Sequence, residues 1–368
     1  MNKLGIDIGS SHTKIIEVGE TNGKKTIVKF AIFPSGSLYE AIMDPNYNKS
    51  KSAISHLKKI LSEAKFSTNV IRITMPDFKI VTKVLTLPIV TGDKHIQQAI
   101  EFVAEEHLPQ PISETIVKYT VIKENLYDPK SPVEVGFMPR AVNFASGEKK
   151  GTMDVLLVAV PKQFVEGYIY LMNKVGLEIE GLEPNSTTSS RVLSYEQHEI
   201  PTIIVEIGSS YTDFILTVDG SVRFVRTMNI GISTLVKSIS EELGLTKSQA
   251  ENYLYTYGLN NTQLGEKIKA PVEPVLSVII QEMQKFQTYV EERIRFSKLG
   301  EQNKIKSIVI SGGGAVIPNF VVYLINKVGQ EISYADPWKQ LDISNVEQKS
   351  LLKFLAPIFT SVAGTMLK

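Results

Sequence analysis

The beginning of the chain alternates short apolar runs with polar turns. Residues 4–8 and 13–18 are rich in branched apolar side chains and flank a Gly-Ser-Ser sequence, a pattern typical of two strands joined by a turn. Residues 53–64 then carry apolar side chains at positions 54, 57, 60, 61 and 64, which is the spacing of one helix face. We therefore predict a hairpin followed by a helix that packs on its sheet.

The same strand-turn-strand unit occurs a second time. Residues 6–13 (IDIGSSHT) match residues 205–212 (VEIGSSYT) position by position. Such self-similarity indicates that the chain has two related halves. In the second copy a strand is expected over residues 212–218, and Asp219-Gly220 between two apolar runs predicts a hairpin turn that needs positive φ.

The segment between the two copies has a different pattern of apolar and polar residues. Residues 78–182 alternate strand-like and helix-like patterns, which predicts a small inserted α+β subdomain. The expected strands lie at residues 79–87, 115–122, 153–160 and 178–182, and the expected helices at 93–107 and 162–175. Residues 123–152 are rich in Pro, Gly, Lys and Asn without periodicity and predict a long hairpin or a flexible loop.

The second half becomes helical after residue 228. Apolar spacing predicts helices at residues 232–243, 247–257 and 274–299, and this helical insert is expected to end near residue 301. A strand at 305–311 then meets three glycines, and Pro318 begins a helix that reaches residue 328. The last periodic run, residues 351–367, is either a core helix or a membrane-surface anchor, and its weakly basic polar face favours the core helix.

Composition excludes several classes of function. The 368 residues suffice for two sizeable cores, and the formal charge of +1 gives no strong field for nucleic acid or an anionic bilayer. The absence of cysteine excludes disulfides, thiolate metal sites and thiol catalysis. The amino terminus lacks the apolar core of a signal peptide, and no stretch approaches the ~18 apolar residues of a membrane span. We expect a cytoplasmic protein without a membrane span.

The repeated loops have the chemistry of a phosphate site. A nucleotide triphosphate needs inward-pointing amides, glycine for close backbone approach, and small hydroxyls. Gly9-Ser10-Ser11 and Gly208-Ser209-Ser210 supply all three, and two such hairpins from opposing lobes would clasp the phosphates from both sides. The acid before each loop, Asp7 or Glu206, would hold Mg²⁺ through water, because Mg²⁺ dehydrates reluctantly.

A third glycine turn completes the pattern. Residues 308–315 (IVISGGGA) place Gly312, Gly313 and Gly314 at the end of a strand, where a base and ribose can lie against bare backbone. In this order and spacing the three elements resemble the actin-like ATPase superfamily, which includes actin, DnaK-type chaperones, sugar kinases, FtsA and PilM. The resemblance implies ATP and Mg²⁺ as cofactors, phosphate loops at 7–14 and 206–213, and an adenosine loop at 311–315.

The chain is more specifically similar to the PilM family of type IV pilus assembly proteins. The resemblance rests on residues 4–11 (LGIDIGSS), 154–162 (DVLLVAVPK), 243–245 (LGL) with Ala250-Glu251, and 311–315 with 335–337 (ADP). It implies an α/β fold of two lobes, each built on a ribonuclease-H-like core, with an FtsA/PilM-type insert in the first lobe. The first lobe core would comprise residues 1–77, 183–200 and 348–368, and its insert residues 78–182. The second core would comprise residues 201–231 and 302–347, and the helical insert residues 232–301.

The resemblance also implies the site and the partner. The nucleotide would contact Gly9, Ser10, Ser11, Thr13, Lys14, Gly208, Ser209, Ser210, Thr212, Glu251, Gly312, Gly313 and Gly314. Asp7 and Glu206 would be both the Mg²⁺-holding and the catalytic acids. The partner would be the N-terminal cytoplasmic peptide of the inner-membrane protein PilN, held in a groove between the first lobe core and the insert. The protein would then associate with the inner membrane through this protein partner, and other pilus assembly proteins would be further partners.

The second phosphate loop departs from the family pattern. It usually begins with Asp, whereas this chain has Glu206. The additional methylene moves the carboxylate by about 1.5 Å, and catalytic positioning is sensitive to displacements of ~1 Å. We therefore hypothesise that the chain binds ATP well but hydrolyses it slowly.

Other readings remain open at this point. An FtsA-like division filament has the same fold, but the chain lacks a basic amphipathic tail. A small-molecule kinase would need a general base in the cleft, and the sequence offers no acidic candidate beyond Asp7 and Glu206. His12 either approaches the phosphates or is exposed at its turn, and Lys14 either neutralises phosphate or extends into solvent. The five histidines show no metal-ligand pairing.

Overall fold

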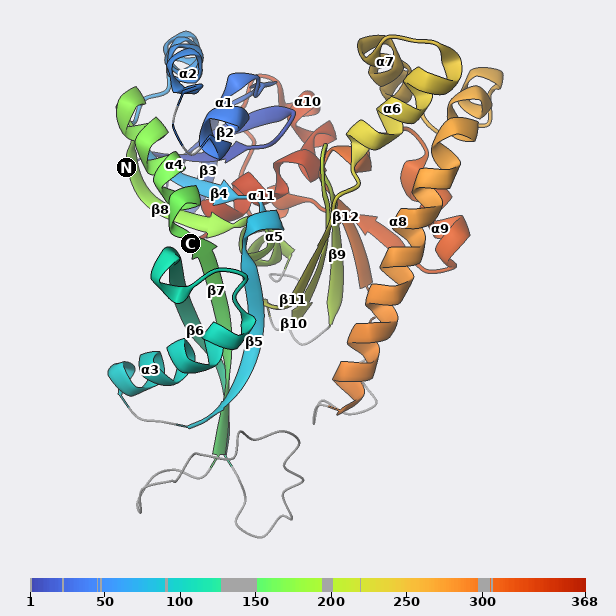
Figure 1. Ribbon diagram of the computed structural model, residues 1–368. Coiled ribbons are helices and arrows are strands. Elements are labelled where there is room, and N and C mark those ends of the chain that lie inside the picture. Colours follow the sequence, from blue (N-terminus) through green and yellow to red (C-terminus); the bar gives the residue numbers. More distant parts are fainter. Residues whose placement is uncertain are drawn as a thin grey trace. The chain divides into compact units, whose positions relative to one another are not determined.

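The computed structural model describes residues 2–21, 23–44, 46, 48–89, 92–126, 151–193, 201–218, 220–296, 305 and 307–368. The chain forms two compact units, a larger one of Met1–Phe78 with Phe164–Lys368 and a smaller one of Lys79–Gln163. Figure 1 labels the elements of both units along the chain. No helix in the described ranges is both long and apolar enough to cross a membrane.

The first sheet of the larger unit begins with the predicted hairpin. Its order is β3-β2-β1-β4-β8, with β1 (Lys3–Ile8), β2 (His12–Thr21), β3 (Lys24–Pro34), β4 (Val70–Met75) and β8 (Glu178–Pro184). The first three strands pair antiparallel, whereas β4 and β8 run parallel to β1. Ile6 of β1 lies opposite Ile15 of β2, and both side chains are fully buried. The helices nearest in sequence are α1 (Ser37–Met43), α2 (Ser50–Ala64) and α4 (Lys162–Val175).

The second sheet of the larger unit repeats this plan. Its five strands in this unit have the order β13-β12-β9-β10-β11, where β9 is Thr202–Ile207, β10 Thr212–Val218, β11 Ser221–Met228, β12 Ser307–Ser311 and β13 Ile332–Tyr334. Strands β9, β10 and β11 pair antiparallel, and β12 runs parallel to β9. The sheet thus copies the hairpin-plus-parallel arrangement of β1, β2 and β4, as the sequence repeat predicts.

Helices cover this second sheet with a continuous apolar core. They are α6 (Ile232–Leu243), α7 (Lys247–Tyr257), α8 (Gln263–Phe296) and α9 (Phe320–Val328). Phe214 of β10 packs against Phe286 of α8 with ring centroids 5.8 Å apart, and both side chains are fully buried. In Figure 1 the long α8 runs beside this sheet. The predicted helices at 232–243 and 247–257 are confirmed, but α8 begins earlier than predicted and contains Pro271 and Pro274.

In its described residues, the smaller unit is an antiparallel sheet with one α-helix. Its strands β5 (Val81–Pro88), β7 (Gly151–Pro161) and β6 (Thr115–Leu126) lie in that order, and α3 (Asp93–Ala104) precedes β6. Leu85, Ile100 and Leu157 belong to one buried apolar cluster of this unit.

Some of the sequence predictions concern residues outside the described ranges. These are most of the predicted loop at 123–152, Asp219, His198 and the predicted end of the helical insert near residue 301. Gly220 has a φ of 71°, the positive value predicted for its turn.

Two short helices that together contact strands of both sheets of the larger unit cross each other at a very small distance. Helix α5 (Asn185–Leu193) contacts α11 (Thr360–Thr365) more extensively than it contacts any other element. A Cβ added to Gly364 of α11 would lie 2.0 Å from the carbonyl oxygen of Thr188 in α5. Ser186, Thr188 and Ser189 are fully buried, although their segment has little apolar periodicity. The close crossing therefore depends on small side chains in α5 and on glycine in α11.

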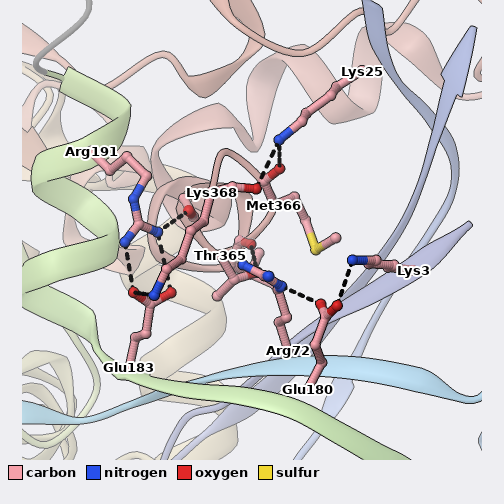
Figure 2. A network of polar contacts seen from close by, with 11 residues as sticks. Lys3, Lys25, Arg72, Glu180, Glu183, Arg191, Thr365, Met366 and Lys368 are labelled. Carbon is pink, nitrogen blue, oxygen red and sulfur yellow. Dashed lines mark hydrogen bonds and ion pairs between the residues drawn. The ribbon is translucent and has the colours of Figure 1, made fainter.

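A polar network holds the end of the chain against the first sheet (Figure 2). Arg191 of α5 donates to Glu183 of β8 at 2.6 Å and to the carbonyl oxygen of Gly364 at 2.6 Å. Lys25 donates to the carbonyl oxygen of Met366 at 2.7 Å. A second carboxylate of β8, Glu180, pairs with Lys3 and Arg72. The edge strand β8, α5 and the carboxyl-terminal segment are thus fastened to one another.

The structure differs from the predicted organisation in two places. Residues 164–182, which were predicted to lie in the insert, belong to the larger unit, because β8 pairs with β4 from Val70 to Met75. The predicted helix at 351–367 is divided into α10 (Lys349–Phe354), the 3₁₀ helix Ala356–Phe359 and α11, because Pro357 cannot continue the first of them. The predicted division into four subdomains stays a prediction.

Candidate functional site

A cavity of about 410 Å³ lies in the larger unit where the three glycine loops meet. Its lining includes Gly9, Ser10 and Ser11 from the first loop, Gly208, Ser209 and Ser210 from the second, and Gly312 and Gly313 from the third. The hydroxyl of Ser210 donates to the hydroxyl of Ser10 at 2.9 Å. Two segments about 200 residues apart in sequence are therefore in direct contact across the cavity.

The two serine loops are built in the same way. The amide of Gly9 donates to the carbonyl oxygen of His12 at 3.2 Å, and the amide of Gly208 donates to that of Tyr211 at 2.9 Å. The structure thus confirms that the sequence repeat is a repeat of turn geometry. Within the described residues, the amides of Ser10, Ser11, Ser209 and Ser210 donate to no protein acceptor.

The carbonyl groups of the second loop are held on its outer side. The first turn of α6 donates to them, from Ile232 to Gly208 at 3.0 Å and from Ser233 to Ser209 at 2.9 Å. Because a trans peptide points its N–H opposite to its C=O, the amides of Ser209 and Ser210 point away from α6. Four free amides in two glycine turns are the type of donor set that binds anionic oxygens.

Asp7 and Lys14 form a partly buried ion pair at the base of the first loop. The Lys14 ammonium donates to Asp7 Oδ2 at 2.6 Å, and only 3% of the Asp7 side chain is exposed. The hydroxyl of Ser361 in α11 donates to the same oxygen at 2.9 Å. Lys14 thus lines the cavity and pairs with Asp7 rather than extending into solvent.

Glu206 is the corresponding acid of the second loop, and its environment is more acidic. Ser189 of α5 donates to Glu206 Oε2 at 2.9 Å. Burial, together with the negative charges of Asp213 and Asp7, raises the pKa of Glu206 to about 7. The two acids at matching positions of the repeat therefore have different electrostatic surroundings, because the Lys14 ammonium lies 2.6 Å from Asp7.

Two further carboxyl groups lie close to Glu206. Asp213 lines the cavity, and burial followed by the charge of Asp77 raises its pKa to about 8. Burial also raises the pKa of Asp77 to about 7, although this carboxyl accepts hydrogen bonds from the amide and hydroxyl of Ser186 at 2.7 and 2.6 Å. The prediction that the cleft has no acid beyond Asp7 and Glu206 is therefore wrong.

The acids do not form a ready-made metal site. Across the described ranges, no three His, Asp or Glu side chains come close enough together to ligate a metal ion directly. A metal at this site would need ligands from water or from a bound phosphate, which is the usual condition for Mg²⁺.

The third loop requires glycine at its first position. Gly312 has φ of 80° and ψ of −176°, a region that is almost exclusive to glycine. A Cβ there would lie 2.5 Å from the carbonyl oxygen of Ile207, the residue before Gly208. The amide of Gly312 donates to the carbonyl oxygen of Pro357 at 2.9 Å. The loop is thus packed against the strand that carries the second serine loop.

The sequence of the chain matches the family model of the type IV pilus assembly protein PilM over residues 5–138 and 141–368. The chain belongs to the PilM family. This confirms the family that the sequence motifs predicted.

Curated relatives of this PilM-family chain include two cell division proteins FtsA. The protein from Borreliella burgdorferi is 27% identical over 169 residues, which are 42% of this chain and 41% of that protein. The protein from Streptococcus pneumoniae is 22% identical over 342 residues, which are 86% of this chain and 71% of that protein. The match to the first relative thus spans less than half of that relative's length.

Solved structures confirm the predicted fold. A PilM-PilN type IV pilus biogenesis complex superposes with a TM-score of 0.79 at 19% identity, covering 99% of this chain and 97% of the other. MreB 5 of Spiroplasma citri bound to AMPPNP gives a TM-score of 0.51 at 11% identity, covering 99% and 95%. The PilM-family chain has the two-lobed actin-like fold.

The structure brings most of the predicted site residues to one cavity. Besides the eight loop residues named above, Asp7, Lys14, Glu206 and Glu251 line it, whereas Thr13, Thr212 and Gly314 do not. The hydroxyl of Thr13 contacts that of Ser35 at 2.8 Å, and the hydroxyl of Thr212 donates to the carbonyl oxygen of Ile230 at 2.7 Å. Both threonines thus bind neighbouring protein segments and do not line the cavity. The roles of all these residues toward a ligand stay predictions.

Sequence reasoning missed the aromatic part of the PilM-family site. Tyr39, Tyr211, Tyr255 and Phe354 line the cavity, together with apolar side chains such as Ile358. Tyr211 stands in the second loop at the position of His12 in the first, so the repeat itself contained a signal for it. His12 contacts Ser11 at 2.9 Å, and burial, partly offset by Glu251, lowers its pKa.

Proposed function

We propose that this chain is a nucleotide-dependent scaffold of type IV pilus assembly that binds ATP with Mg²⁺ between its two lobes. The observation that carries the proposal is the pair of matching glycine-serine hairpins that face one cavity and touch through Ser10 and Ser210. Their free amides offer donors to phosphate oxygens from both sides. The fold, shared with an MreB structure that contains AMPPNP, supports the same conclusion.

The residues of the cavity fit a magnesium nucleotide. Asp7 and Glu206 would hold the ion through water molecules, and Lys14 would share its charge between Asp7 and a phosphate oxygen. When bound, Mg²⁺ neutralises phosphate charge and orients the triphosphate. Gly312, Gly313 and Tyr255 would face the base and ribose, and Glu251 would accept from the ribose hydroxyls.

Hydrolysis by this site is proposed to be slow. The carboxylate of Glu206 is displaced by its additional methylene and held by Ser189 of α5 at 2.9 Å. Its raised pKa leaves it partly protonated at neutral pH, which makes it a weaker acceptor for water that attacks a phosphate. Asp213 is a further acid at the cavity wall and would be the first alternative base.

The proposed partner is the N-terminal cytoplasmic peptide of PilN. The support is the family membership and the likeness to a PilM-PilN complex. Through this peptide the protein would be held at the cytoplasmic face of the inner membrane, next to other pilus assembly proteins. The predicted groove for the peptide involves both units of the chain and stays a prediction.

Nucleotide binding is tested by placing one negative charge in a phosphate loop. Ser10→Asp should lower the affinity for Mg-ATP, measured by isothermal titration calorimetry, by at least about tenfold, because a carboxylate beside the phosphates repels them. Ser52→Asp is the matched control, because Ser52 is exposed on α2 and does not line the cavity. Equal affinities of the two variants would refute this position of the nucleotide.

The scaffold role is tested by its partner. The full chain, with and without Mg-ATP, is titrated with a synthetic N-terminal PilN peptide, and retention of full-length PilN from solubilised membranes is scored in parallel. Binding of the peptide supports the pilus role. Sedimenting filaments would instead favour a role like that of the FtsA relatives, and phosphate transfer to a small molecule would refute both.

A further inference from the structure

An aromatic stack connects the second serine loop to the residue at which the chain leaves the larger unit. The ring of Tyr211, in the loop itself, lies on the ring of Phe78 with centroids 4.4 Å apart and planes inclined by 6°. Phe78 is the last residue of the larger unit before the chain enters the smaller unit at Lys79. A residue of the cavity wall therefore contacts the connection between the two units.

The ring contacts extend to Phe164, where the chain returns from the smaller unit to the larger one. The ring of Phe78 meets that of Phe164 edge to face at 6.2 Å, and Phe164 is the first residue of the larger unit after the smaller unit ends at Gln163. Phe164 in turn packs on Tyr168 at 5.4 Å, and both side chains are buried. Both chain connections of the smaller unit thus end in rings that touch each other.

The segment before Phe78 is also part of the cavity. Pro76 lines it, and Asp77 is one of the acidic groups near Glu206. Asp77 is fixed by two hydrogen bonds from Ser186 at the start of α5. The three residues before the smaller unit therefore all lie at the site. Pro76 lines the cavity, Asp77 belongs to the acidic cluster, and Phe78 contacts the second serine loop.

We propose that Phe78 is a positioning residue that couples nucleotide occupancy of the cavity to the smaller unit. When the loop of Gly208 to Tyr211 closes on a triphosphate, the stacked Tyr211 ring moves Phe78, and Phe78 shifts both connections of the smaller unit. A pair of stacked rings contributes a free energy that corresponds to about two- to tenfold in an equilibrium, which limits the coupling through this contact. Coupling of this kind is reciprocal.

The inference rests on the proposed nucleotide site and adds a route from that site to the smaller unit. It is tested by amide hydrogen exchange of residues 79–126 and 151–163 in the full chain, with and without Mg-AMPPNP. In the wild type, nucleotide should change the exchange rates in these segments by about two- to tenfold. Phe78→Leu should abolish that change while the calorimetric affinity for Mg-AMPPNP stays within about threefold of the wild-type value.

Four further variants make the test specific. Tyr211→Leu removes the same stack and should reproduce the loss, and the double variant should lose no more than either single variant. Tyr211→Phe keeps the ring and should keep the response. Tyr253→Leu is the matched control, because Tyr253 forms an edge-to-face pair with Tyr257 on α7 and does not line the cavity.

The outcomes separate this inference from the proposed function. An unchanged response in Phe78→Leu, or a wild type that binds nucleotide without any response in the smaller unit, overturns the coupling and leaves the nucleotide site intact. A wild type that binds no nucleotide overturns both. Loss of the response in Tyr253→Leu as well would show that the effect is general destabilisation and would overturn the role of Phe78.

Discussion

Replacement of Gly312 by alanine should lower the free energy of unfolding by an amount that can be worked out from the structure. The φ of 80° and ψ of −176° of Gly312 lie in a region that costs other residues about 1–3 kcal/mol. A Cβ would also lie 2.5 Å from the oxygen and 2.8 Å from the carbon of the Ile207 carbonyl group, so backbone must move, and such overpacking costs a further ~1–3 kcal/mol. Gly312→Ala should therefore lower the free energy of unfolding by about 2–6 kcal/mol.

Gly329 provides the matched control for this substitution. It has φ of 71° and ψ of 24° after α9, and a Cβ there would meet no atom within 4 Å. Gly329→Ala should cost only the left-handed backbone term, about 1–2 kcal/mol. Alanine lowers the conformational entropy of the unfolded chain in both variants, and this contribution cancels in the comparison.

The assay is urea unfolding of both variants followed by circular dichroism, together with calorimetric binding of Mg-ATP. Because Ile207 directly precedes Gly208, displacement of its backbone should also weaken nucleotide binding by Gly312→Ala but not by Gly329→Ala. Equal losses of unfolding free energy in the two variants would refute the steric argument. An unchanged affinity for Mg-ATP in Gly312→Ala would refute the connection between the third loop and the second.

Three other predictions concern charged groups. Glu206→Asp should raise ATP turnover in a phosphate-release assay with little change in affinity, and unchanged turnover would contradict the proposed reason for slow hydrolysis. Burial and the charge of Glu206 raise the pKa of Asp77 to about 7, and burial and the charge of Asp77 raise that of Asp213 to about 8. The folded state therefore holds protons that the unfolded chain releases near pH 4. The free energy of unfolding without nucleotide should therefore fall as the pH rises from about 4 to about 8, and Asp213→Asn should flatten this dependence in melting curves. Arg191→Ala leaves Glu183 without its bidentate partner and should cost about 1–3 kcal/mol in urea unfolding.

Each of these has a result that would count against it. A melting temperature that rises over the same pH range, or an equally steep dependence in Asp213→Asn, would mean that the two carboxyl groups are ionised in the folded state. For the network of Figure 2, Lys59→Met is the control, because the exposed pair of Lys59 and Glu63 should contribute less than about 0.5 kcal/mol. An equal effect of both substitutions would show that Arg191 contributes no more than a surface charge.

Local pattern sufficed for the hairpins and for two of the helices. The turns at Gly9 and Gly208 follow from glycine and serine between apolar runs, and their hydrogen bonds agree with the repeat in the sequence. The helices at 232–243 and 247–257 follow from apolar periodicity. These features depend on interactions between residues that are close in sequence, so the sequence alone could predict them.

Helix α5 shows where local pattern fails. The segment Asn185–Leu193 is mostly Ser, Thr and Asn, residues that compete with helical hydrogen bonding and usually favour turns. It is helical here because α11 crosses it closely at Gly364, and because its hydroxyl groups donate to carboxyl groups, Ser186 to Asp77 and Ser189 to Glu206. The reason for the helix thus lies in distant segments of the chain.

The sequence by itself determined the family, the two-lobed fold and the residues of the three glycine loops. Only the tertiary structure decided that Asp77, Glu206 and Asp213 share one acidic environment, that Ser10 touches Ser210, and that Tyr211 stacks on Phe78. The physical reason is that turns and helix faces depend on neighbours along the chain. A pKa or an aromatic stack depends instead on groups that folding brings together from opposite parts of the molecule.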